Sequence, residues 1–193
     1  MTATPAALIG DPFYGIPYFA HKEFDSPDAP GSGKKMQRRF VVMLFNARVY
    51  FAKPIRVNHG FRTRTYSSIL RRRGYAVVKN SAHELGLAAD LDAPEADIVN
   101  LVRSLFMAGF RRFGVMATAL HVDNDDDRPS PAVWGYTNTP SARLARVRLL
   151  VAELVAEGVR ENENRLLAKI DALKKEAQEL GFTINVTYVN TKK

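Results

Sequence analysis

Three side chains with metal-binding chemistry occur in two short strings of the sequence. The string S-A-H-E-L-G-L-A-A-D (81–90) holds His83 and Asp90, and A-L-H-V-D (119–123) adds His121. Two imidazoles and one carboxylate leave a fourth position for water, which is the pattern of a catalytic zinc site, whereas structural sites have four protein ligands. The chain has no cysteine, so His and carboxylate must supply the ligands. The residues therefore predict a zinc hydrolase, although the same ligands accept other first-row metals.

The first string resembles the S-x-H-x-x-G-x-A-x-D signature of the zinc D-alanyl-D-alanine carboxypeptidases. That family includes phage L-alanyl-D-glutamate endopeptidases and shares its metal site with hedgehog signalling domains. The string H-V-D (121–123) resembles the segment with the third ligand, and N-H-G-F-R-T (58–63) resembles the family's S-G-Y-R-[ST] segment. F-D-S-P-D-A-P-G-S-G (24–33) and P-A-V-W-G-Y (131–136) are similar to phage-encoded members, so the resemblance covers residues 19–136.

The resemblance implies roles for five residues. His83, Asp90 and His121 would bind zinc. Arg62 would reach the substrate carboxylate or the developing oxyanion, because a guanidinium suits both. Ser81 would hydrogen-bond within the site and contact the substrate. The alternatives are an ordinary surface ion pair for Arg62 and a plain turn residue for Ser81.

The general base is the weakest part of the pattern. Many relatives have a His two residues before the third ligand, or an acidic residue three before it, but this chain has Ala119 and Thr118 there. Neither can accept a proton from water. Asp123 lies on the same strand face as His121 and is the candidate, either as base or as a residue that orients His121. Glu84 and His59 are held in reserve.

The spacing of apolar residues predicts the elements around these strings. Helices are expected over 36–51 and 66–73, and over 94–106 with Asp92 as N-cap. Strands are expected over 56–58, after the tight turn at Gly86, over 113–123 with a turn near 117–118, and over 133–136. This order predicts an α+β fold, in which a small, mainly antiparallel sheet carries a zinc groove and is flanked by helices.

The domain prediction has four parts. Residues 1–33 form an N-terminal arm pressed onto the surface by its aromatic residues, 34–136 form the zinc peptidase-like domain, and 137–140 form a linker. Residues 141–193 form a helical appendage, weakened near Gly158 and ending in a strand over 182–188. The appendage could mediate homo-oligomerisation, anchor the chain to a virion partner, or cover the domain.

The net charge of +8 favours polyanionic partners, which include acidic cell wall, nucleic acid and anionic membrane. No nucleic-acid-binding motif accompanies the arginine clusters, and no apolar run is long enough for a transmembrane segment. We see no signal peptide, so the host cytoplasm or the virion is expected as the location. The prediction is a phage-encoded zinc peptidase, an endolysin acting on the peptidoglycan stem peptide. The alternative is a structural or wall-binding virion component that keeps a degenerate peptidase domain.

Overall fold

The computed structural model describes residues 10–75 and 77–179. Residues through Ala152 form one compact unit, and the chain from Glu153 onward forms a second. The predicted strand over 182–188 lies outside the described residues.

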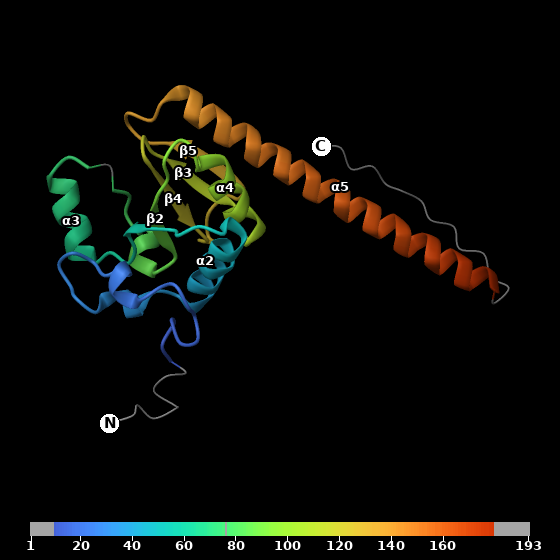
Figure 1. Cartoon of the computed structure of the whole chain (residues 1–193), viewed down its shortest axis with the longest axis horizontal. Coiled ribbons are helices and arrows are strands. Elements are labelled where there is room, and N and C mark those ends of the chain that lie inside the picture. The colour runs from blue at the N-terminus through green and yellow to red at the C-terminus, as the bar shows by residue number, and fades with distance from the viewer. Residues whose placement is uncertain (1–9, 76, 180–193) are drawn as a thin grey trace. The chain divides into compact units, whose positions relative to one another are not determined.

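A five-stranded sheet forms the centre of the first unit (Figure 1). Its strands are β1 (Val57–His59), β2 (Ala88–Asp92), β3 (Arg112–Val115), β4 (Ala119–Asp123) and β5 (Ala132–Gly135). Their order is β1-β2-β4-β3-β5, and every pair is antiparallel except the parallel pair of β3 and β5. The α+β fold with a mainly antiparallel sheet is thus confirmed.

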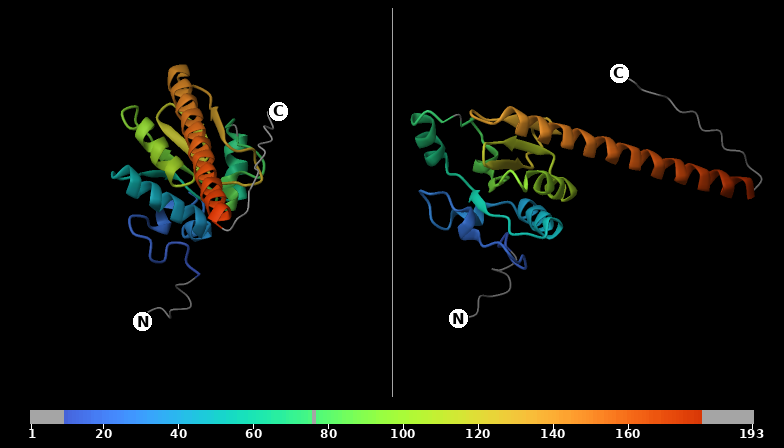
Figure 2. Two further views of the ribbon diagram at one scale, coloured as in Figure 1. Left: turned by 90° about the vertical axis from the view of Figure 1, so that its right-hand side faces the viewer. Right: turned by 45° about the horizontal axis from the view of Figure 1, so that its top comes forward.

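The two faces of the sheet have different chemistry. One face is apolar and fully buried, with Leu91, Phe113, Leu120 and Val122 all at 0% exposure. Helices α2 (Arg38–Phe51) and α4 (Ile98–Met107) lie side by side and contribute buried side chains to the same core (Figure 2). Strand alternation places the polar residues of β2, β3 and β4 on the opposite face. Apolar burial on one side therefore fixes which residues the other side presents.

The start of α4 differs from the prediction. The helix begins at Ile98, and its N-cap is Asp97. Residues 94–97 form a turn in which the Asp97 amide donates to the Pro94 carbonyl at 2.9 Å. Asp92 is not an N-cap, because it is the last residue of β2 and pairs there with Ala119. Strand pairing takes precedence over the local capping preference.

The N-terminal arm is pressed onto the domain through part of its aromatic set. Phe13, Phe19 and Phe24 are buried, whereas Tyr14 and Tyr18 are exposed. The Phe61 amide donates to the Phe24 carbonyl at 2.8 Å, so the arm contacts the segment that follows β1. The short helical turns η1 (His21–Phe24) and η2 (Ser32–Lys35) give the arm its local structure. The end of η1 thereby contacts the chain that leads to Arg62.

Helix α5 (Ser141–Glu179) runs without interruption through Gly158, contrary to the expected weak join. A helical glycine costs only about 1 kcal/mol relative to alanine, which a long helix tolerates. The helix begins at Ser141, directly after 137–140, and its first turns belong to the compact unit. Arg143 is buried there and donates to the carbonyls of Ala93 and Met116. No described helix is long and apolar enough to cross a membrane.

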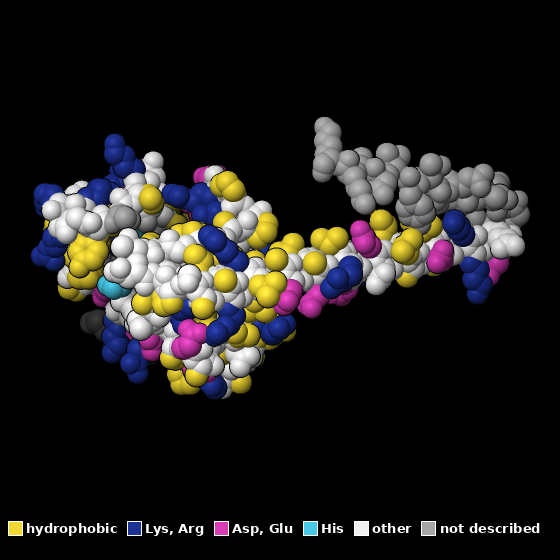
Figure 3. All heavy atoms as spheres, turned by 90° about the horizontal axis from the view of Figure 1, so that it is seen from above, with side chains coloured by type: hydrophobic (Ala, Val, Ile, Leu, Met, Phe, Trp, Pro, Cys, Tyr) yellow, Lys and Arg dark blue, Asp and Glu magenta, His cyan; other side chains and the backbone are white. Residues whose placement is uncertain are grey.

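In the second unit, the described part of α5 exposes apolar side chains among charged ones. Val159, Leu166 and Leu173 are more than half exposed. The compact unit, by contrast, shows Lys and Arg at several separate places on the face in Figure 3, with no continuous basic stripe on that face.

Candidate metal centre

The polar face of the sheet brings five residues into one row. Strand pairing sets His59 opposite Asp90, Asp90 opposite His121, His121 opposite Gly114, and Gly114 opposite Trp134. Residues that are directly opposite in a sheet have side chains on the same face, about 5 Å apart. The row therefore contains two of the three predicted ligands as direct neighbours.

His83 reaches the row from outside the sheet. It lies in the single turn η3 (Ala82–Leu85), which begins after Ser81 and ends at Gly86. Gly86 has φ +70°, and a Cβ there would meet the Lys35 carbonyl oxygen at 2.3 Å. Only glycine fits this turn, as expected, and it directs the chain from η3 into β2. Ser81 is buried beside this turn, and its carbonyl accepts from the Glu84 amide at 2.8 Å.

The three predicted ligands converge on one point. His83 Nε2 lies 3.1 Å from His121 Nδ1 and 3.4 Å from Asp90 Oδ1, and His121 Nδ1 lies 2.9 Å from Asp90 Oδ1. Ligands bound to zinc at 2.0–2.1 Å in a tetrahedron are about 3.3 Å apart. All three residues are buried, with 2%, 7% and 6% exposure in chain order. This group could hold a metal ion.

The far nitrogen of each imidazole is occupied by a hydrogen bond. His83 Nδ1 lies 2.7 Å from the Gly60 carbonyl, which can only accept, so this nitrogen carries the proton. His121 Nε2 lies 3.2 Å from Asp123 Oδ2 and donates to it. The remaining nitrogens, His83 Nε2 and His121 Nδ1, face each other and Asp90. Such outer contacts are typical of metal-binding histidines, because they fix the tautomer and the ring orientation.

Asp123 is held in place from its other side. Its Oδ1 accepts from Arg112 Nε at 2.7 Å and from the Asp125 amide at 3.2 Å. Arg112 is opposite Asp123 in the pairing of β3 with β4, and both are buried. Sequence reasoning missed Arg112. The sequence feature that could have revealed Arg112 is its place in R-F-G-V (112–115). A charged residue one position before a buried aromatic residue of a strand lies on the opposite, polar face.

The charges of the metal-free group follow from burial and contact. Burial lowers the pKa of His83, so this imidazole is neutral. Burial also disfavours ionisation of Asp90, but the two neighbouring imidazoles outweigh it and hold the pKa of that carboxyl well below its usual range. For His121, burial acts to lower the pKa, yet the hydrogen bonds to Asp123 and Asp90 prevail and raise its pKa to about 9. His121 is therefore cationic at neutral pH, and a metal must displace its proton.

Two polar side chains stand at the rim of the group. Arg62 Nη2 lies 3.6 Å from Asp90 Oδ2 with its side chain 12% exposed, and His59 Nδ1 lies 3.8 Å from the same oxygen with its side chain 50% exposed. The Arg62 amide donates to the His83 carbonyl at 3.1 Å, which ties this segment to η3. The structure thus brings Arg62 to the site, as expected. Glu84 points elsewhere, with Oε2 3.8 Å from Arg64 Nε.

Two aromatic side chains flank His121, and sequence reasoning assigned them only to a closing strand. The Trp134 ring centroid lies 5.5 Å from that of His121, and the Tyr136 centroid lies 6.4 Å from it. A Cβ at Gly114 would meet Tyr136 Cε2 at 2.7 Å and Trp134 Cε2 at 2.8 Å. The missing side chain at Gly114 is what allows both rings to lie beside His121.

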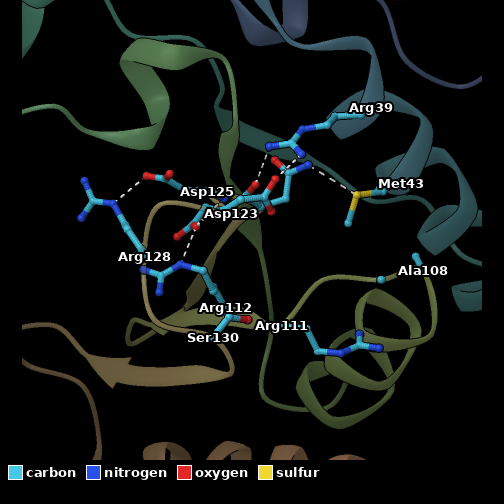
Figure 4. Close-up of a pocket in the computed structure, with 12 residues that line it drawn as sticks. Arg39, Met43, Ala108, Arg111, Arg112, Asp123, Asp125, Arg128 and Ser130 are labelled. Carbon is cyan, nitrogen blue, oxygen red and sulfur yellow. Dashed lines mark hydrogen bonds and ion pairs between the residues drawn. The ribbon is translucent and has the colours of Figure 1, made fainter. Parts of the chain in front are cut away.

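A separate cavity of about 410 Å³ adjoins the outer contacts of the group (Figure 4). Asp123 and Arg112 line it, but His83, Asp90 and His121 do not. Arg39 pairs there with Asp126, and Arg128 pairs with Asp125 at 2.6 Å. The charged side chains of this cavity therefore largely pair with one another. The cavity is separate from the group of His83, Asp90 and His121, called the metal-binding group below, because none of the three lines it.

No family model matches the chain, and no curated protein matches it. The metal-binding group is therefore supported by the geometry of this chain alone.

Proposed function

We propose that the chain is a zinc-dependent peptidase that cleaves amide bonds in the stem peptide of peptidoglycan. The observation that carries the proposal is the convergence of His83 Nε2, Asp90 Oδ1 and His121 Nδ1 within 3.4 Å of one another. Two imidazoles and one carboxylate fit zinc and leave one position for water or substrate. The ordered resemblance over residues 19–136 to the zinc carboxypeptidases supplies the substrate class.

When bound, zinc would polarise the scissile carbonyl and lower the pKa of a bound water toward about 7. The residues of the chain would do the rest. Arg62 lies at the rim beside Asp90 and would bind a substrate carboxylate or the carbonyl oxygen as it gains charge. Ser81 would contribute a hydrogen bond near η3. The structure gives the positions of Arg62 and Ser81, and the two roles are part of the proposal.

Of the two roles expected for Asp123, the geometry favours orientation of His121. Its Oδ2 contacts His121 Nε2, which is the nitrogen turned away from the metal-binding group. The imidazole ring therefore stands between Asp123 and the point where water would bind. Arg112 and the Asp125 amide occupy the other oxygen. An anionic Asp123 in this place raises the basicity of His121 as a ligand.

His59 is the residue best placed to serve as the base. It is next to Asp90 in the row, it is half exposed, and its Nδ1 lies 3.8 Å from Asp90 Oδ2. In the proposed reaction, His59 takes a proton from the attacking water as its oxygen bonds to the carbonyl carbon. The same proton then passes to the amide nitrogen as the carbon–nitrogen bond breaks, so the proton balance is closed.

Digestion of purified peptidoglycan tests the proposal. Fragments identified by mass spectrometry should show a cleaved stem peptide, and EDTA should abolish the cleavage until zinc is restored. Cleavage that survives complete metal removal would reject a metal mechanism. The products also separate carboxypeptidase from endopeptidase activity, because only the former releases a terminal D-alanine.

The second candidate is a structural or wall-binding virion component that keeps a degenerate peptidase domain. The observation that favours it is the identity of the residues before the third ligand, Thr118 and Ala119, neither of which can act as a base. A zinc-loaded protein that binds peptidoglycan but leaves every stem-peptide bond intact would support this candidate over the enzyme.

A further inference from the structure

Tyr136 occupies a space beside the metal-binding group that two small residues leave open. Gly114 is opposite His121 on β3, and Tyr136 Cε2 lies 2.7 Å from the place that a Cβ at Gly114 would take. Ala119 is two residues before His121 on the same strand face and presents only a methyl group. The row thus has a gap on this side of His121, and an aromatic ring with a hydroxyl lies beside it.

The backbone of Tyr136 is fixed just beyond the end of β5. Its amide donates to the Val115 carbonyl at 3.1 Å and to Thr139 Oγ1 at 3.0 Å. Thr139 in turn donates its hydroxyl proton to the same Val115 carbonyl at 2.6 Å. These bonds anchor the residue to β3, the strand that also carries Gly114. The ring position is therefore set by the sheet and by the short turn after it.

The side chain of Tyr136 ends in a phenol hydroxyl, which is protonated in the ordinary state of a tyrosine at neutral pH. A neutral phenol is a hydrogen-bond donor, and oxygen acceptors that gain negative charge bind such a donor more strongly than neutral ones. Arg62 is placed on the Asp90 side of the group, whereas Tyr136 is placed on the His121 side.

We infer that Tyr136 is a catalytic residue whose hydroxyl donates a hydrogen bond to the substrate carbonyl oxygen as that oxygen becomes negative. The inference rests on the proposed peptidase function. The donated proton stays on Tyr136, so the hydroxyl stabilises the tetrahedral state without changing the proton balance. Arg62 and Tyr136 then approach the reacting oxygen from two sides, in the manner of an oxyanion hole.

Substitution Tyr136→Phe tests the role, because it removes one oxygen and keeps the ring beside Gly114. The binding of zinc-loaded protein to phosphinate analogues of the D-Ala-D-Ala and L-Ala-D-Glu dipeptides is measured by calorimetry, since a phosphinate mimics the tetrahedral state. The wild type binds one of them, and Tyr136→Phe weakens that binding roughly 10- to 100-fold, as expected for one hydrogen bond to a charged group. Zinc content stays unchanged, and the KM for the corresponding cleavable peptide changes little, because the hydroxyl acts on the charged state only.

The control is Tyr14→Phe, which removes the hydroxyl of a tyrosine that is 49% exposed on the N-terminal arm. This variant should bind the phosphinate as the wild type does. Equal phosphinate affinity in Tyr136→Phe and wild type would overturn the role of Tyr136 and leave the peptidase proposal standing. A wild-type protein that holds zinc but binds neither phosphinate would overturn both.

Discussion

Zinc binding should displace about one proton from His121 at pH 7, because the metal must take the position of that proton. The metal-free group contains a neutral His83, an anionic Asp90 and a cationic His121, whose pKa is raised to about 9. In the zinc-bound state all three residues must be free of protons at their ligand atoms. His121 is therefore the one ligand whose protonation differs between the two states at neutral pH.

The magnitude follows from that pKa. At pH 7, about 99% of His121 carries its extra proton when its pKa is about 9. Loss of this one proton should raise apparent zinc affinity about tenfold for each pH unit between 7 and 9, and this contribution should level off above pH 9. The same shift affects folding of the metal-free protein. The folded pKa exceeds the unfolded value of 6.5, so the stabilisation is complete below pH 6.5 and is lost as pH rises through 9.

Isothermal titration calorimetry in buffers with different ionisation enthalpies measures the protons released for each zinc bound. We expect about one proton from His121 at pH 7, in addition to the fraction that a zinc-bound water of pKa about 7 gives up. The share from His121 should fall away as pH rises through 9, whereas the share from the water should persist. The substitution Asp123→Asn removes the strongest hydrogen bond that raises the pKa of His121, so it should reduce the release at pH 7. No proton release in the wild type at pH 7 would refute the charge assignment of the group.

Three further predictions concern the ligands and their support. Asp90→Asn should weaken zinc binding more than about 100-fold without unfolding the protein, because it removes the anionic ligand but keeps the shape of the side chain. The zinc titration can be followed by the fluorescence of Trp134, the single tryptophan, whose ring lies beside His121. Arg112→Met should destabilise the protein by about 1–3 kcal/mol in urea unfolding, since the buried Asp123 then keeps His121 but loses its guanidinium partner. The double change with Asp123→Asn should recover part of this loss. Gly114→Ala should cost about 1–3 kcal/mol by overpacking and alter the emission of Trp134. The matched change Gly158→Ala, where a Cβ meets nothing within 4 Å, should instead stabilise by up to about 1 kcal/mol. Equal effects at the two glycines would contradict the account of the ring packing.

Much of the site could be predicted because its signals are local. The period of two in β4 places His121 and Asp123 on one face, and a glycine after His83 predicts the turn that the structure contains. The α+β fold follows from the order of apolar patterns along the chain. These features depend on residues a few positions apart, which the sequence displays directly.

The remaining features depend on which strands become neighbours. Arg112 and Trp134 reach His121 and its partner Asp123 only because β3 lies between β4 and β5. Nothing in the local pattern of R-F-G-V or V-W-G-Y specifies that order. The burial of Arg143 in the first turn of α5 has a similar cause, since it depends on contacts with residues about thirty and fifty positions earlier. A helical pattern predicts a helix but not the surface against which it packs.

The central claim is that His83, Asp90 and His121 bind one metal ion, and the zinc K-edge X-ray absorption spectrum tests it most directly. Protein loaded with one equivalent of zinc should show four light ligands at about 2.0–2.1 Å, with the scattering pattern of two imidazoles. His121→Ala should lose one imidazole from this shell, whereas His21→Gln, at a histidine of the N-terminal arm, should leave the spectrum unchanged. A shell of six oxygens, or a spectrum that His121→Ala does not alter, would contradict the account.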